Sequence, residues 1–118
     1  MTELVVADAA QAHTTRDLEP MFAPQSIAVI GASRRPGTVG HAVLQNLIYG
    51  GYTGVVYPVN PKAKSLSAMR CVPSLAAIDD HVDLGVIVTP ATVIPDLVEE
   101  GANLGIKHFL VISAGFKE

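Results

Sequence analysis

The sequence predicts an α/β fold in which a parallel sheet lies between two layers of helices. Four short apolar runs are spaced along the chain, and segments with helix signals lie between them. Strands of a parallel sheet are buried on both faces, so they read as uninterrupted apolar runs rather than as alternating patterns. With 118 residues, the chain has room for one domain of this kind.

Each element follows from its own local signal. Strands are predicted over residues 26–30, 55–59, 84–88 and 108–112, and helices over 38–49, 75–78 and 92–104. Glycines follow the two longer helices and stop them, Ser74 is a plausible N-cap of the short one, and Pro95 is tolerated because it falls in a first turn. Right-handed crossovers then give a Rossmann-like three-layer fold, with a ligand outside the carboxyl ends of the strands.

The two ends of the chain lack this regularity. Residues 1–21 are predicted to be a flexible leader, because 1–16 has no periodicity and 17–22 suffices for a single helical turn. The domain is predicted over residues 22–118, with 62–72 as a loop. A doubly wound sheet normally continues beyond a fourth strand, so the fold is predicted to be truncated there.

Composition excludes several classes of protein. The chain is 49% apolar and 16% charged, which is too apolar for a disordered chain. No apolar stretch reaches the roughly 20 residues of a spanning helix, so no membrane partner is expected. The single cysteine, Cys71, excludes an internal disulfide and a thiolate zinc cage, and it favours a reducing cytoplasm as the compartment.

The charges are unevenly distributed. No Asp or Glu lies between Glu19 and Asp79, although the net charge is −3. The basic residues in that interval are Arg34, Arg35, Lys62, Lys64 and Arg70. This pattern indicates a local site for a small polyanion rather than a nucleic-acid surface, although a chance gap in acids gives the same arithmetic.

A glycine loop, Gly31-Ala-Ser-Arg-Arg-Pro-Gly37-Thr-Val-Gly40, joins the first predicted strand to the first long helix. Gly31 permits a tight turn, and the other two glycines let backbone amides approach a phosphate. Ser33 stands where the dinucleotide fingerprint has its middle glycine, so the loop does not match that motif. A purely structural strand-to-helix turn also favours glycine.

The end of the second strand reads Asn60-Pro61-Lys62-Ala63-Lys64. NAD-binding proteins place an acidic residue here for the ribose hydroxyl, and this segment has none. The two lysines suit an extra phosphate on an adenosine ribose, which both an NADP-type ligand and coenzyme A (CoA) carry. Lysines that are merely solvated remain an alternative.

Four motifs at successive strand ends resemble one known family. They are Ser26-Ile-Ala-Val-Ile-Gly-Ala-Ser33, Tyr57-Pro-Val-Asn-Pro-Lys62, Asp83-Leu-Gly-Val-Ile-Val-Thr-Pro-Ala91 and Ile112-Ser-Ala-Gly-Phe116. Together they are similar to the CoA-binding domain of NDP-forming (ADP-forming) acyl-CoA synthetases, a group related to the succinyl-CoA synthetase alpha subunit. The resemblance covers residues 22–118 in order.

The resemblance implies a CoA site. It assigns the CoA phosphates and nearby pantetheine to the first loop, the adenosine phosphates to the lysines, and the pantetheine channel and its reactive end to the last two strand ends. The residues implied are Gly31, Ser33, Arg34, Arg35, Gly37, Thr38, Lys62, Lys64, Thr89, Pro90, Ala91, Ile112, Ser113 and Ala114.

The resemblance also implies a role in a ligase for acetate or another short-chain acid, acting through an acyl phosphate and a phosphohistidine. That histidine and the nucleotide-grasp portion belong to domains outside this chain, so no catalytic residue is expected here, and ATP or ADP would act only through those domains. The implied partners are CoA and the remaining synthetase domains or subunit, with a homo-oligomer possible.

Two residues invite a chemical role that we reject. Gly40-His41-Ala42 mimics the short motif around the family's phosphohistidine, but His41 falls in the first helical turn rather than in a later domain. The histidines have no partners at ligand spacing, so no metal site is indicated. Cys71 is interpreted as a packing residue rather than a nucleophile.

Two other functions fit the residues. One is an NADP-dependent oxidoreductase or sensor, against which Ser33 argues because the fingerprint glycine is missing. The other is a stand-alone CoA-binding regulator, in which a short chain is completed by dimerisation.

Overall fold

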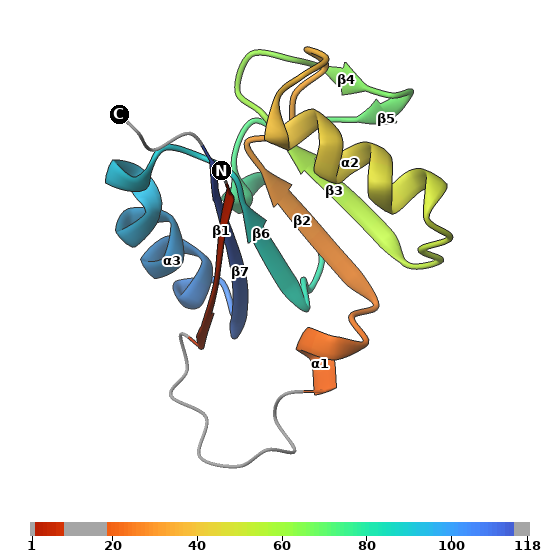
Figure 1. The fold of residues 1–118 in the computed structure, drawn as a ribbon. Helices are drawn as coiled ribbons and strands as arrows, with labels where there is room; N and C mark the ends of the chain where they lie inside the picture. The colour runs from red at the N-terminus through yellow and green to blue at the C-terminus, as the bar shows by residue number, and fades with distance from the viewer. Residues whose placement is uncertain (1, 9–18, 115–118) are drawn as a thin grey trace.

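A five-stranded sheet forms the centre of the protein, and the computed structural model describes residues 2–8 and 19–114 (Figure 1). Its strands are β1 (Thr2–Asp8), β2 (Ser26–Ile30), β3 (Val55–Val59), β6 (Leu84–Ile87) and β7 (His108–Ala114). The spatial order is β1-β7-β6-β2-β3. The last four strands are mutually parallel, and β1 runs antiparallel to β7.

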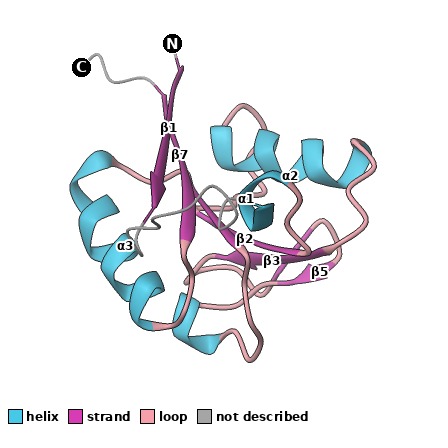
Figure 2. Cartoon of the chain, turned by 90° about the horizontal axis from the view of Figure 1, so that it is seen from below, coloured by secondary structure: helices cyan, strands magenta, loops and turns pink. Residues whose placement is uncertain are grey.

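Two helices cover opposite faces of the sheet, as Figure 2 shows from below. The two covering helices are α2 (Val39–Tyr49) and α3 (Ile94–Asn103). A one-turn helix α1 (Glu19–Phe22) and the 3-10 turns η2 (Leu75–Ala77) and η3 (Ala91–Val93) complete the helical elements of the described residues. Side chains of α2 pack into one apolar cluster and those of α3 into another, on the two sides of the strands. The predicted three-layer parallel architecture is therefore confirmed. None of the helices in the described ranges has the length and apolar character needed to cross a membrane.

The central strands explain why uninterrupted apolar runs identified the sheet. All five residues of β2 and all four of β6 are buried. Each of these strands has a parallel neighbour on both sides, and helices cover both faces, so neither face offers a place for polar side chains.

The predicted flexible leader is wrong in part. Residues Thr2–Asp8 form β1, which pairs with β7 from Thr2 opposite Ala114 to Asp8 opposite His108. The edge of the fourth predicted strand is therefore covered by a strand from the start of the chain. Backbone pairing drives such an edge strand, and this demands little of side-chain pattern. The single turn expected within 17–22 is present as α1.

The loop predicted over 62–72 is also wrong in part. It contains a hairpin of β4 (Ser65–Leu66) and β5 (Met69–Arg70). Ser67 and Ala68 at its tip have positive φ angles of 52° and 67°, where hairpins normally use Asn or Gly. Leu66, with 2% of its surface exposed, packs into the α2-side core, so tertiary burial supports a turn that its own residues do not signal.

The ring of Phe109 fills the core between β6 and α3. Its side chain is fully buried. A Cβ atom added to Gly101 of α3 would lie 2.5 Å from Phe109 Cζ, and one added to Gly85 of β6 would lie 2.9 Å from Cδ1. Glycine at these two positions therefore makes room for the ring.

Gly101→Ala is expected to destabilise the protein by about 1–3 kcal/mol, because the added methyl group overpacks the core against Phe109. Helix propensity alone would give the opposite sign, since alanine stabilises a helix by about 1 kcal/mol relative to glycine. Urea unfolding of the wild type and the variant measures the difference. In a Phe109→Leu background, where the ring is absent, Gly101→Ala should cost much less than it does in the wild type. A Gly101→Ala protein more stable than wild type would contradict this account.

Candidate ligand-binding site

Two cavities meet at the carboxyl ends of the parallel strands. The first, which we name the α3-side cavity, has a volume of about 480 Å³, and the second, the α2-side cavity, about 500 Å³. Gly31, Ser33 and Thr89 line both of them. Volumes in this range hold a small organic ligand, and this edge of an open α/β sheet is where such ligands bind.

The glycine loop brings the start of α2 very close to the end of β2. Gly31 has a φ of +97°, and a Cβ atom there would lie 2.9 Å from the carbonyl oxygen of Val88. A Cβ atom on Gly40 would overlap the carbonyl oxygen of Gly31. A side chain at Gly40 would push α2 away from the end of β2, and one at Gly31 would clash with Val88 after the neighbouring strand β6, so both glycines are needed for the shape of the site.

A short hydrogen-bond chain shapes the loop between these glycines. The Thr38 hydroxyl caps α2 by accepting from the His41 amide at 3.2 Å, and it donates to the Arg35 carbonyl at 2.8 Å. The Ser33 hydroxyl accepts from the Arg35 amide at 3.0 Å, which leaves its proton to donate to a ligand. The N-terminus of an 11-residue helix therefore lies beside a serine hydroxyl, an arrangement that favours an anion.

Asn60 ties the loops after β2 and β3 together. Its side-chain amide donates to the Ala32 carbonyl at 2.8 Å, and its Oδ1 accepts from the Lys62 backbone amide at 2.7 Å. Both loops contribute lining to the α3-side cavity. The sequence analysis assigned no role to Asn60, although an asparagine directly after a strand and before a proline is a recognised turn signal.

Asn60→Asp is expected to cost about 1–3 kcal/mol, because it removes the donor and sets a carboxylate oxygen against the Ala32 carbonyl. Thermal and urea unfolding measure the loss. Gln45→Glu is the matched control, since the Gln45 amide donates at 2.8 Å to the Ser67 hydroxyl, a partner that can itself donate to a carboxylate. Equal stability of Asn60→Asp and wild type would show that the loops hold together without this bridge.

Most of the residues assigned from sequence lie at these two cavities. The α3-side cavity contains Gly31, Ser33, Lys62 and Thr89, and the α2-side cavity contains Gly31, Ser33, Thr38, Thr89, Pro90, Ala91 and Ile112. Ser113 and Ala114 end β7, and their side chains lie outside the described part of the chain.

Four assigned residues line neither cavity: Arg34, Arg35, Gly37 and Lys64. The Arg34 guanidinium donates to the Ser65 carbonyl at 3.2 Å, so it contacts the β4–β5 hairpin. Gly37 has a φ of +91° with open space around it, which indicates a turn requirement rather than a close approach. Lys64 lies two residues beyond Lys62 and is exposed.

The sequence analysis missed the wall of the α3-side cavity that η2, η3 and α3 provide. Its residues are Pro73, Ser74, Leu75, Val93, Leu97 and Glu100. Ser74 precedes η2 as predicted, but its side chain makes no capping hydrogen bond. Val93 and Leu97 have the helical spacing expected of a buried face, and local periodicity cannot separate a core position from a cavity wall.

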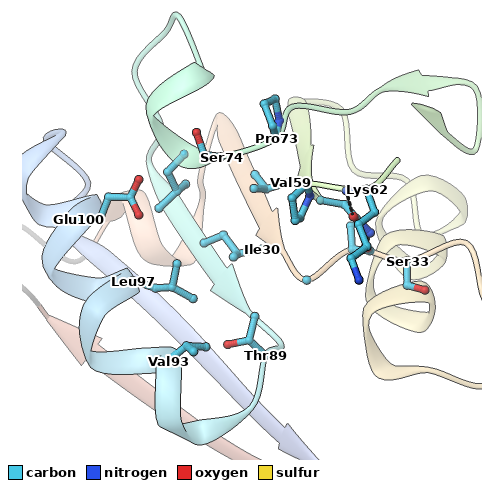
Figure 3. A pocket seen from close by; sticks show the side chains of 15 residues that line it. Ile30, Ser33, Val59, Lys62, Pro73, Ser74, Thr89, Val93, Leu97 and Glu100 are labelled. Atoms are coloured by element: carbon cyan, nitrogen blue, oxygen red, sulfur yellow. Dashed lines mark hydrogen bonds between the residues drawn. The ribbon is translucent and has the colours of Figure 1, made fainter. Parts of the chain in front are cut away.

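The charges at the site also differ from the uniformly basic lining that the acid-free segment of the sequence predicts. Lys62 supplies a positive charge to the α3-side cavity, and Glu100 supplies a negative charge across it (Figure 3). Glu100 comes from α3, which follows the acid-free segment in the chain. The cavity therefore has two ends of opposite charge rather than a uniformly basic lining.

Cys71 is buried, with 8% of its surface exposed. Burial raises the pKa of its thiol, and the backbone hydrogen bond with Asn60 and the nearby Arg34 offset this only in part. Its sulfur lies 3.7 Å from the Asn60 carbonyl and 3.8 Å from that of Val72. These properties support a packing role. Among the described side chains, those of residues 19–112, no group of three His, Cys, Asp or Glu could hold a metal ion.

The folded protein is expected to react slowly with iodoacetamide at Cys71. A raised pKa lowers the thiolate fraction at any pH below it, and burial restricts access to the sulfur. Mass spectrometry at pH 8 should show alkylation at least tenfold slower than in urea-unfolded protein. Equal rates in the two states would identify Cys71 as an accessible, reactive thiol.

Comparison with known proteins identifies the family. Residues 25–118 match the model of the CoA binding domain. The chain belongs to this family. The CoA binding domain is thereby confirmed over nearly the whole segment that the four motifs had indicated.

Two curated relatives of this CoA binding domain are much longer proteins. It is 42% identical over 106 residues to an ADP-forming acetate–CoA ligase II of Archaeoglobus fulgidus, covering 90% of this chain and 16% of the relative. It is 44% identical over 105 residues to the alpha subunit of ADP-forming acetate–CoA ligase I of Pyrococcus furiosus, covering 86% and 23%. The chain thus spans less than a quarter of these curated relatives.

A solved structure gives the same relationship. The dinucleotide-forming acetyl-coenzyme A synthetase 1 of Candidatus Korarchaeum cryptofilum, in complex with phosphate and ADP, aligns with a TM-score of 0.75 at 38% identity. The match covers 79% of this CoA binding domain and 20% of that chain.

Proposed function

We propose that this chain binds CoA along the carboxyl ends of its sheet and serves as the CoA-binding part of an ADP-forming acyl-CoA synthetase for acetate or another short-chain acid. The observation that carries the proposal is a pair of adjacent cavities, whose junction we take to be their three shared lining residues, Gly31, Ser33 and Thr89. One long ligand can cross that junction and occupy both cavities, as a molecule with an adenosine head and an extended arm requires.

The charges indicate which part of CoA each cavity receives. The α3-side cavity combines an apolar lining with Lys62, which suits the adenosine and its 3′-phosphate. The α2-side cavity includes Thr38 and Gly40 at the start of α2, and it suits the diphosphate and the first part of the pantetheine. Ser33, at the junction, is placed to donate its hydroxyl proton to a phosphate oxygen.

The rest of the α2-side cavity guides the thiol arm. Thr89, Pro90, Ala91 and Ile112 line it, which directs the arm between the ends of β6 and β7. In the proposed synthetase the CoA sulfur attacks an acyl phosphate, the new bond is a thioester, and inorganic phosphate leaves. This chain contributes binding and orientation to that step, whereas the phosphohistidine and the ATP or ADP site would come from other domains.

The proposal includes a partner. One relative is named as an alpha subunit, which supports association of this chain with further synthetase domains or a second subunit. A homo-oligomer and a cytoplasmic location stay predictions from the sequence.

Lys62→Ala is expected to weaken CoA binding at least tenfold in isothermal titration, because a charged hydrogen bond to phosphate contributes about 1.5–3 kcal/mol. Lys64→Ala is the matched control: it removes the same charge outside both cavities and should change affinity less than about threefold at 0.15 M salt. Against dephospho-CoA, which lacks the 3′-phosphate, the Lys62→Ala penalty should largely disappear.

Competition between ligands tests the function itself. CoA and desulfo-CoA should bind with similar affinity, since most contacts are to adenosine and phosphates, and NADP should displace neither at equal concentration. If the folded wild-type protein bound NADP tightly and did not bind CoA, this proposal would be wrong and an NADP-dependent oxidoreductase or sensor would be the better hypothesis.

A further inference from the structure

Glu100 is a polar group of the α3-side cavity to which the proposed function so far gives no role. Figure 3 shows its carboxylate directed from α3 toward the cavity, across from Lys62. Among the side chains described, those of residues 19–112, none makes a hydrogen bond or ion pair with this carboxylate. Its neighbours Asp96 and Glu99 on the same helix are exposed and line no part of this cavity, whereas Glu100 is half-buried.

The opposite charges of the cavity orient any adenosine phosphate within it. A phosphate next to Glu100 would be repelled by the carboxylate, and a phosphate next to Lys62 is attracted. The ribose phosphate therefore lies toward Lys62, and the other end of the nucleoside, its base, lies toward Glu100.

The wall between the two charges suits a flat aromatic ring. Ile30 and Val59 at the sheet end lie between Glu100 and Lys62 in Figure 3, and Leu75 of η2 and Leu97 of α3 line the same cavity. Apolar side chains of this kind pack against a ring without distinguishing one purine from another. Discrimination needs a polar group at the edge of the base, and the carboxylate of Glu100 is an acceptor in that position.

We propose that Glu100 selects adenine, by accepting a hydrogen bond from its exocyclic amino group. The inference rests on the proposed binding of CoA and adds the residue that reads its base. A carboxylate accepts hydrogen bonds and donates none when ionised, so it favours a purine that presents an amino group and disfavours one that presents an oxygen or a blocked nitrogen at that edge. Ser74 lies on the same wall and makes no capping hydrogen bond, so its hydroxyl can donate to a ring nitrogen.

The test compares CoA with 1,N6-etheno-CoA, in which the exocyclic nitrogen is tied into a ring and has no proton to donate. Titration calorimetry is carried out on the wild type, Glu100→Ala, Glu100→Gln and the control Glu99→Gln. The control removes the same charge one residue away, on the exposed side of α3. Circular dichroism confirms that each variant is folded.

The wild type and Glu99→Gln should bind CoA at least tenfold more tightly than etheno-CoA, because a hydrogen bond to a charged group is lost. In Glu100→Ala the CoA affinity should fall to that for etheno-CoA, so that the preference disappears. Glu100→Gln, whose amide oxygen still accepts, should retain part of the preference.

Two results would overturn the role of Glu100 while leaving CoA binding intact: equal affinity of the wild type for the two ligands, or a preference that persists unchanged in Glu100→Ala. The comparison of CoA with etheno-CoA on the wild type remains informative even if a variant fails to fold. A wild type that binds neither ligand is a different failure, since it would overturn the proposed function as well.

Discussion

The close packing of the first turn of α2 against the end of β2 is the constraint on which the site depends. Gly31 turns the chain in a conformation with positive φ, and Gly40 brings α2 onto the Gly31 carbonyl with no room for a side chain. This contact places the amides at the start of α2 beside Ser33 and sets the boundary that the two cavities share. A helix held farther out would leave a shallower surface with no common junction.

The remaining parts of the site depend on how neighbouring strand ends are connected. Parallel strands deliver all their following loops to one edge of the sheet, so residues distant in the chain become neighbours there. Asn60 fastens two of these loops to each other and carries Lys62 to the cavity. Glu100 belongs to α3, in the helix layer on the other side of the sheet from α2. The result is a cavity with a lysine at one end and a carboxylate at the other, and a phosphorylated nucleoside bound in one direction would complement these charges.

Prediction from sequence succeeded where burial of an element produces a recognisable run of apolar residues within that element. The apolar runs of β2 and β6 are uninterrupted because both faces of each strand are covered. It failed where structure depends on backbone pairing or on a distant contact. Thr2–Asp8 forms β1 by pairing along β7, and the β4–β5 hairpin has a tip at Ser67 and Ala68 that carries no turn signal. In both cases a distant contact decides the outcome: pairing with β7 for β1, and burial of Leu66 for the hairpin.

The same distinction applies to the site. Local sequence pattern was sufficient to locate the glycine loop, the strand ends and the absence of an acidic residue after β3, because each of these features involves only a few consecutive residues. Local pattern could not show that Lys62 lines a cavity while Lys64 does not, that Arg34 donates to the Ser65 carbonyl, or that Glu100 lies opposite Lys62. Those outcomes follow from the direction in which a packed loop or helix presents its side chains, and that direction is set by contacts between layers that lie far apart in the chain.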